Sequence, residues 1–150
     1  MADFAVETYA QVIDEIGPML PAHWAELAVH KDIPLDPDFD FYKKADEIGL
    51  LEIMTVRKDG VLIGYALWVV KRHPHYKAHS WAINDIIWLR PDHRRENIGS
   101  SFIAFWEAEF RRKNVSVVHV ETKIASTALM FLLMKNGYQA TSAGVEKRLV

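Results

Sequence analysis

The sequence predicts an α/β domain built on a mixed β-sheet, and three stretches carry this prediction. From Ser80 to Val120 the chain alternates strand, helix and strand, which within one sheet makes a right-handed crossover between parallel strands. Upstream, Leu50–Arg57 and Val61–Lys71 flank Asp59-Gly60, a dipeptide typical of antiparallel hairpins. The segment Ser80–Leu89 is apolar on both faces, as expected for a central strand covered on both sides.

The remaining elements follow from apolar spacing and from turn residues. We expect a short strand, two helical stretches, a proline-rich loop and a third helix before the hairpin, and a long helix, a buried strand, a helix and a last strand after the central strand. In chain order the ranges are Phe4–Glu7, Tyr9–Ile16, Met19–Val29, Ile33–Phe39 for the loop, Phe41–Ile48, Ile98–Lys113, Val115–Val120, Ser126–Lys135 and Val145–Val150.

Composition limits the class of protein. The chain has 150 residues, half of them hydrophobic and a quarter charged, which suits one ordinary globular domain over residues 1–150. A net charge of −2 argues against nucleic acid or an anionic membrane as the main partner. There is no cysteine, no basic and apolar leader at the N-terminus, and no apolar run long enough to span a bilayer. We therefore expect a soluble cytoplasmic domain.

The loop between the central strand and the long helix has the residues of an anion-binding site. Asn97 and Gly99 flank the expected helix start, and both residue types tolerate the positive φ of a tight loop. The first turn of a helix offers N–H groups without internal partners, and its dipole favours anions. Arg94 and Arg95 add charge in a fork that suits phosphate oxygens, and Ser100 adds a small donor. The loop predicts a pyrophosphate cradle; the alternative is an ordinary helix start with solvated arginines.

The motif R-x-x-N-x-G at Arg94–Gly99, after a hydrophobic strand and Pro91, resembles the acyl-CoA-binding motif Q/R-x-x-G-x-G/A of the GCN5-related N-acetyltransferase (GNAT) superfamily. Asn97 stands where the first glycine usually lies. The resemblance covers most of the chain, and it implies the GNAT fold, helices on both faces of the sheet, and acetyl-CoA as cosubstrate. In the family the strand before the cradle binds pantetheine through its backbone. The implied cofactor-binding residues are Ile87, Trp88, Leu89, Arg94, Arg95, Asn97, Ile98, Gly99, Ser100 and Ser126.

Asp85 is the first candidate for a catalytic residue. It lies in the otherwise apolar segment A-I-N-D-I-I-W-L, where an unpaired buried carboxylate is costly. Buried carboxylates with a shifted pKa cluster at functional sites, and family members often carry an acidic general base on this strand. A structural carboxylate bonded to a neighbouring strand is the alternative. Asn84 is expected on the opposite face, and His75, His23 and Glu26 are alternative bases.

Candidates for acceptor binding come from three places in the chain. The segment H-W-A-E puts His23 and Glu26 on one helix face, in the region that walls the acceptor site in the family; a solvated helix with its tryptophan in the core is the alternative. His75 and Tyr76 precede the central strand, and Glu121 follows the next strand, at an edge that ligands favour. The predicted substrate-binding residues are His23, Trp24, Glu26, Tyr76 and Glu121.

Three further observations qualify these assignments. His73, His75 and His79 lack a matching carboxylate motif, so no metal site is expected. Ser126 either contacts the cofactor or only caps its helix. Leu133 stands four residues before Gly137-Tyr138, where the family often has the tyrosine that protonates the leaving thiolate.

The resemblance implies an N-acetyltransferase in which a primary amine of a small molecule, or a protein lysine or N-terminus, attacks acetyl-CoA directly. The segments H-W-x-E, H-Y and D-x-x-x-x-x-P-x-x-R-R are also similar to acetyltransferase-like proteins of bacteriophages. Two alternatives are a CoA-binding module without turnover, which Leu133 favours, and a protein-interaction module of structural or regulatory use. Exposed strand edges permit a homodimer.

Overall fold

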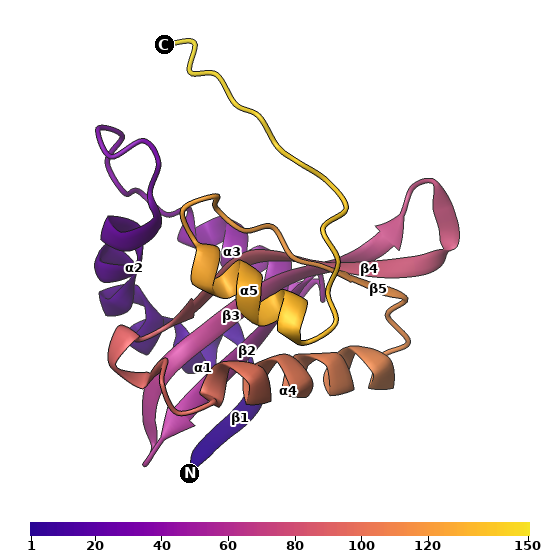
Figure 1. Ribbon diagram of the computed structural model, residues 1–150, viewed down its shortest axis with the longest axis horizontal. Helices are drawn as coiled ribbons and strands as arrows, with labels where there is room; N and C mark the ends of the chain where they lie inside the picture. Colours follow the sequence, from indigo (N-terminus) through magenta and orange to yellow (C-terminus); the bar gives the residue numbers. More distant parts are fainter.

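The computed structural model describes all 150 residues and contains five strands and five α-helices (Figure 1). Short 3-10 helices precede α2 and α4, at Gly17–Met19 and Pro91–His93. In chain order the main elements are β1 Ala2–Glu7, α1 Tyr9–Ile16, α2 Leu20–Leu27, α3 Phe39–Glu47, β2 Leu51–Lys58, β3 Val61–His73, β4 Tyr76–Leu89, α4 Ile98–Arg112, β5 Val117–His119 and α5 Thr127–Lys135.

The strands form one mixed sheet in the order β1-β2-β3-β4-β5. The first three pairings are antiparallel, and β4 pairs with β5 in parallel over Trp81–Ile83 and Val117–His119. The predicted hairpin and the predicted crossover through the long helix are therefore confirmed. In the hairpin turn, Asp59 and Gly60 have φ of 52° and 78°, the two left-handed residues that a tight type I′ connection needs.

Helices cover both faces of the sheet, as the resemblance implied (Figure 1). On the face of α4 and α5, Trp68 of the sheet meets Trp106 and Phe110 of α4 edge-on, with ring centroids 5.1 and 5.2 Å apart. On the face of α1, α2 and α3, Val12 and Ile16 of α1 pack with buried sheet residues. The aromatic stripe predicted for the long helix is thus the core contact of α4.

A β-bulge interrupts the pairing of β3 with β4. The register passes from Leu67↔Ile86 to Trp68↔Asn84, so Asp85 has no partner residue. Asp85 is exposed. The prediction that this carboxylate is buried in a regular strand was wrong, because the extra residue of the bulge turns it out of the sheet.

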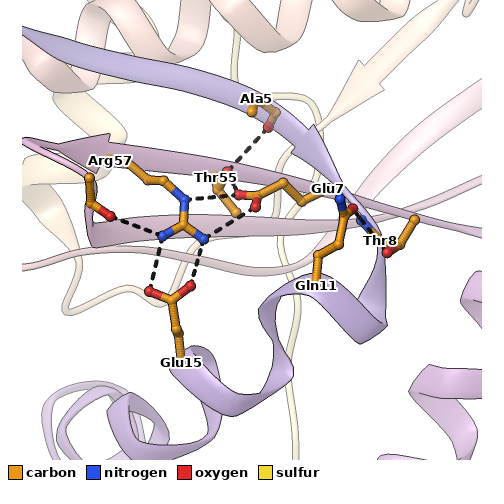
Figure 2. A network of polar contacts seen from close by, with 8 residues as sticks. Ala5, Glu7, Thr8, Gln11, Glu15, Thr55 and Arg57 are labelled. Atoms are coloured by element: carbon orange, nitrogen blue, oxygen red, sulfur yellow. Dashed lines mark hydrogen bonds and ion pairs between the residues drawn. The ribbon is translucent and has the colours of Figure 1, made fainter.

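Arg57 of β2 links this strand to β1 and to α1 (Figure 2). Its guanidinium donates to both Glu7 oxygens at 3.2 Å and to the two Glu15 oxygens at 3.0 and 2.7 Å. Thr55, fully buried, donates to Glu7 as well. The hydrogen bond from Arg57 lowers the pKa of Glu15. The charged groups of Arg57, Glu7 and Glu15 are paired with one another. We therefore assign this network a structural role.

The C-terminal end differs from the prediction, because residues 139–150 form no strand. Val145 and Leu149, the apolar residues expected to pair, are 100% and 84% exposed. The segment runs as an extended chain (Figure 1), with Glu146 accepting a 3.0 Å hydrogen bond from His30 and Arg148 paired with Asp32. β5 is consequently the last strand of the sheet. None of the helices has the length and apolar character needed to cross a membrane.

Candidate functional site

The site begins where β4 and β5 part. Their backbone pairing ends at Ile83↔His119, and β4 continues to Leu89 paired with β3 only. Beyond that point the Asn84 side chain takes the place of the next backbone pairing between the two segments. Its Nδ2 donates to the Glu121 carbonyl at 3.1 Å, and its Oδ1 accepts from the Glu121 N–H at 2.6 Å. Glu121 thus lies at the split, as predicted, and its carboxylate is 77% exposed.

Past the split, β4 has backbone groups that face the gap left by β5. The Arg90 N–H donates to the Ile63 carbonyl of β3 at 2.8 Å. Because successive residues of a strand point their peptide groups to opposite sides, Ile87 and Leu89 face away from β3. The Leu89 carbonyl accepts a 2.8 Å bond from Arg94 Nε. The Ile87 peptide remains directed into the gap, suited to pairing with an extended amide-containing ligand.

The loop after β4 ends in the N-terminus of α4. Asn97, with φ of 59°, turns the chain into the helix, and its carbonyl accepts the Ser101 N–H at 3.2 Å. The N–H groups of Ile98, Gly99 and Ser100 therefore have no partner within the helix. Ser100 Oγ accepts a 3.3 Å bond from Asn136. The left-handed conformation predicted for Asn97 is confirmed.

Gly99 serves a different purpose from the one expected. It lies in the helix without a positive φ, and a Cβ built on it would lie 2.7 Å from Leu132 Cδ2 of α5. The glycine is needed for the close approach of α5 to the first turn of α4. The turn geometry comes from Asn97 alone.

The guanidinium group of Arg94 is already hydrogen-bonded within the protein and is not free to bind a ligand. Its Nη1 and Nη2 donate to the two Glu26 oxygens of α2 at 2.6 and 2.8 Å. The hydrogen bond from Arg94 lowers the pKa of Glu26. Arg95 is exposed and forms no ion pair. Of the two predicted phosphate-binding arginines, Arg95 is thus the free cation, and Arg94 fastens the loop to α2.

His23 and Glu26 do share one face of α2, and this face meets Trp88 of β4. Trp88 Nε1 donates to Glu26 Oε2 at 2.9 Å, and the His23 ring stacks on Trp88 at 5.7 Å. His23 Nδ1 lies 3.0 Å from the Tyr65 hydroxyl. Burial lowers the pKa of His23 to about 4, so its ring is neutral at pH 7. A neutral ring with so low a pKa is a weak base, which favours a packing role for His23.

Asp85 has one protein partner. Tyr42 of α3 donates its hydroxyl to Asp85 Oδ2 at 2.7 Å. Burial, followed by the hydrogen bond to Asp85, raises the pKa of Tyr42 above that of an ordinary phenol. The phenol therefore stays protonated and holds the carboxylate in place. The sequence did not point to Tyr42, because it stands 43 residues from Asp85 within an ordinary amphipathic helix.

A cavity of about 390 Å³ lies on the same face of the sheet, and we call it the α1–α2 cavity. Tyr42 lines it, as does Ile86, the residue after Asp85. Trp24, predicted to bind the acceptor, also lines it. Eighteen residues, fourteen of them hydrophobic, form its wall: Tyr9, Val12, Ile13, Ile16, Leu20, Trp24, Ala28, His30, Ile33, Pro34, Leu35, Asp36, Pro37, Phe39, Tyr42, Ile53, Leu67 and Ile86.

His75 and Tyr76 lie elsewhere. His75 lies in the turn of the β3–β4 hairpin and Tyr76 is the first residue of β4, where it pairs with His73. Tyr76 precedes Asp85 by nine residues of one strand, which at roughly 3.3 Å per residue is about 30 Å. The long strand therefore places His75, an alternative base, and Tyr76, a predicted acceptor-binding residue, far from Asp85, and their roles stay predictions. No three His, Asp or Glu side chains are arranged to hold a metal ion.

Two predicted positions lie on α5. Ser126 is at its N-cap, but its side chain forms no capping hydrogen bond. Leu133, where the family often has a tyrosine, is 3% exposed and packs in the core between the sheet, α4 and α5. The fold therefore uses this position for apolar packing.

Comparison with known proteins extends these observations. A family model described as the acetyltransferase (GNAT) family matches residues 11–138. No curated protein matches the chain by sequence.

Solved structures share the fold. A ribosomal-protein-alanine N-acetyltransferase from Brucella melitensis biovar Abortus 2308 superposes with a TM-score of 0.76 at 18% identity, covering 100% of both chains. An aminoglycoside acetyltransferase from an uncultured soil metagenomic sample, in complex with sisomicin, gives 0.78 at 11% identity, covering 99% of this chain and 95% of that one. A predicted acetyltransferase with acetyl-CoA from Clostridium acetobutylicum gives 0.74 at 13%, covering 99% and 96%. With the family model spanning strands β2 to β5, the split between β4 and β5 and the loop into α4, we conclude that the chain belongs to the acetyltransferase (GNAT) family and is an N-acetyltransferase.

Proposed function

We propose that the protein transfers an acetyl group from acetyl-CoA to a primary amine by direct attack. The observation that carries this proposal is the position of Asp85. Its exposed carboxylate stands on the bulge of β4, next to the split from β5 and, through Tyr42, at the wall of the α1–α2 cavity. A base lying between a cosubstrate gap and an acceptor cavity is what amine acetylation requires.

The residues around the split fit acetyl-CoA. The Ile87 peptide and its neighbours Trp88 and Leu89 would pair with the amides of pantetheine. The unpaired N–H groups of Ile98, Gly99 and Ser100 would hold the pyrophosphate, together with Arg95. Asn97 shapes this turn, Arg94 fixes the loop through Glu26, and Ser126, at the N-cap of α5, has a hydroxyl without a capping bond that would contact the cofactor. When bound, acetyl-CoA supplies an acetyl group activated as a thioester.

Asp85 is proposed as the general base. An amine in neutral water is mostly an ammonium ion, which cannot attack a carbonyl until it loses a proton. Asp85 takes that proton directly or through one water molecule. The amine nitrogen then forms the C–N bond as the C–S bond breaks. The leaving sulfur takes a proton from water, because Leu133 offers none where the family often has a tyrosine.

The first test is calorimetric titration of the folded protein with acetyl-CoA, followed by thiol release with an amine acceptor. We expect Asp85→Asn to lower kcat/KM by about 10²- to 10⁴-fold while the Kd for acetyl-CoA is unchanged. Asp14→Asn, at an exposed position of α1, is the matched control and should behave as the wild type. Absence of acetyl-CoA binding by the folded wild type would refute the proposal.

The burial of Leu133 favours one other use, a CoA-binding module without turnover. That protein would bind acetyl-CoA but release no thiol with any amine, and Asp85→Asn would have no rate to change. The same pair of measurements therefore separates the two functions.

A further inference from the structure

We infer that the acceptor is a small arylalkylamine, with one primary amine joined by a short aliphatic chain to an aromatic body that binds in the α1–α2 cavity. This inference rests on the proposed acetyl transfer and specifies its acceptor. It is carried by the apolar wall of the cavity together with the single carboxylate at its β4 end.

The size of the cavity limits the ligand. Pockets for small molecules hold about 300–1,000 Å³, and this one, at about 390 Å³, is at the small end. It is bounded by α1, α2, α3 and the segment 28–37, with Ile86 and Leu67 of the sheet as its floor. Such a space suits a body of one or two rings better than an oligosaccharide or a folded peptide segment.

The chemistry of the wall selects an apolar body. Aromatic rings of Tyr9, Trp24, Phe39 and Tyr42 contribute to it, and the remaining lining is mostly aliphatic. Rings gain from offset or edge-to-face contact with other rings. Apart from the phenols of Tyr9 and Tyr42, only His30 and Asp36 bring ionisable side chains to the wall. A ligand with many hydroxyl or ammonium groups would leave most of them without partners, which costs free energy.

The amine is expected at the β4 end of the cavity. Tyr42 occupies Oδ2 of Asp85, and Oδ1 accepts no hydrogen bond from the protein. Asp85 and Ile86, neighbours at the bulge, both face the side of α1 to α3, since one meets Tyr42 and the other lines the cavity. An ammonium ion bound to Oδ1 would therefore be adjacent to a body in contact with Ile86. This closeness requires a short chain between ring and nitrogen.

The test compares amines as acceptors in the presence of saturating acetyl-CoA, with release of free thiol as the readout. Phenethylamine and tryptamine represent the proposed class, spermidine represents flexible polycations, and kanamycin represents polar aminosugars. We expect kcat/KM for the two arylalkylamines to exceed that for the other two by at least a hundredfold. A preference for spermidine or kanamycin would overturn the inference.

Two variants address the cavity directly. Ala28→Leu, at the C-cap of α2, places a larger side chain in the wall, and Ala25→Leu makes the same change at an exposed position within α2. We expect the first to raise KM for phenethylamine at least tenfold and the second to leave it unchanged, with equal Kd for acetyl-CoA. Leu35→Asn should also raise the KM for phenethylamine. Leu35 lies in a loop of the cavity wall, so this change is not expected to unfold the protein. An unchanged KM for phenethylamine in both Ala28→Leu and Leu35→Asn would exclude the α1–α2 cavity as the binding site of the acceptor.

Calorimetric titration with phenethylamine alone separates this inference from the proposed function. Binding that Ala28→Leu weakens, without thiol release, would retain the ligand class and refute acetyl transfer. Acetylation of spermidine with no binding of phenethylamine would retain acetyl transfer and refute the ligand class.

Discussion

Glu26 of α2 holds Arg94 through two hydrogen bonds of 2.6 and 2.8 Å, and the same carboxylate accepts the indole N–H of Trp88 at 2.9 Å. One side chain thereby joins three parts of the site: α2, the end of β4 and the loop before α4. The arginine that the motif assigns to phosphate binding is thus a structural link between α2 and the loop before α4.

Arg95 and Arg94 are expected to respond differently to removal. Arg95→Gln should weaken acetyl-CoA binding about ten- to a hundredfold, because a charge-assisted hydrogen bond contributes roughly 1.5–3 kcal/mol and 1.4 kcal/mol is about a factor of ten. Arg94→Gln should chiefly lower the free energy of unfolding, since it leaves Glu26 without its partner. Calorimetry with acetyl-CoA and urea denaturation measure the two effects.

Arg111→Gln is the control for these variants, because Arg111 is 73% exposed near the other end of α4. It should change neither quantity appreciably. Equal losses of acetyl-CoA affinity in Arg94→Gln and Arg95→Gln, with unchanged stability, would contradict the division of roles.

His23 should make the stability of the protein depend on pH. Its pKa is about 4 in the folded protein and 6.5 in the unfolded chain. Between these values the unfolded chain binds more protons, so the free energy of unfolding falls as the pH is lowered from 6.5 towards 4. His23→Gln should reduce this fall, as measured by urea denaturation at several pH values.

At pH 8 and above His23 is neutral in both states, so there the wild type and His23→Gln should show parallel pH dependence. Glu26, whose pKa is lowered, adds a loss of stability only as the pH falls below its unfolded value near 4.5. The comparison is therefore made from pH 6.5 to 5. Identical slopes in that window would show that His23 is not the group responsible.

Gly99→Ala should destabilise the protein by about 1–3 kcal/mol, because the added methyl group overpacks against Leu132. The contact is with the end of a flexible side chain, so Leu132→Ala should remove most of the penalty in the double variant. Gly17→Ala is the control, since a Cβ there meets nothing within 4 Å. Additive losses in the double variant, measured by denaturation, would argue against this contact.

Asn84→Leu should cost about 1–3 kcal/mol, since it removes two hydrogen bonds to Glu121 of roughly 0.5–1.5 kcal/mol each. It should also raise the Kd for acetyl-CoA, because the bonds set the split between β4 and β5. Ser80→Ala on the same strand, whose single bond to Asn114 is long at 3.4 Å, is the control. Normal acetyl-CoA affinity in Asn84→Leu would show that the split does not depend on this side chain.

Local patterns predicted most of the fold, because each has a short-range cause. The Asp59-Gly60 turn, the left-handed Asn97 and the aromatic stripe of α4 depend on residues near one another in the chain. The bulge at Asp85 depends on pairing with β3, and no residue pattern of β4 alone signals it. The last strand was predicted at Val145–Val150, but residues 139–150 gain no pairing partner.

The candidate site was predictable only in part for the same reason. Arg94 and Arg95 are adjacent and chemically equivalent, and only the position of Glu26, 68 residues away, distinguishes them. Tyr42 meets Asp85 through tertiary packing of α3. The bacteriophage resemblance, the cytoplasmic location and a homodimer stay predictions.

The bulge at Asp85 means that the residue proposed for catalysis is not one that the strand pairing needs. Because Leu67 pairs with Ile86 and Trp68 with Asn84, excision of residue 85 would bring two consecutive pairs into ordinary register. Asp85 is the one extra residue of the bulge, and it makes no contribution to the strand pairing. The sheet could therefore lose its proposed base, or exchange it for another side chain, without any change in how its strands are aligned.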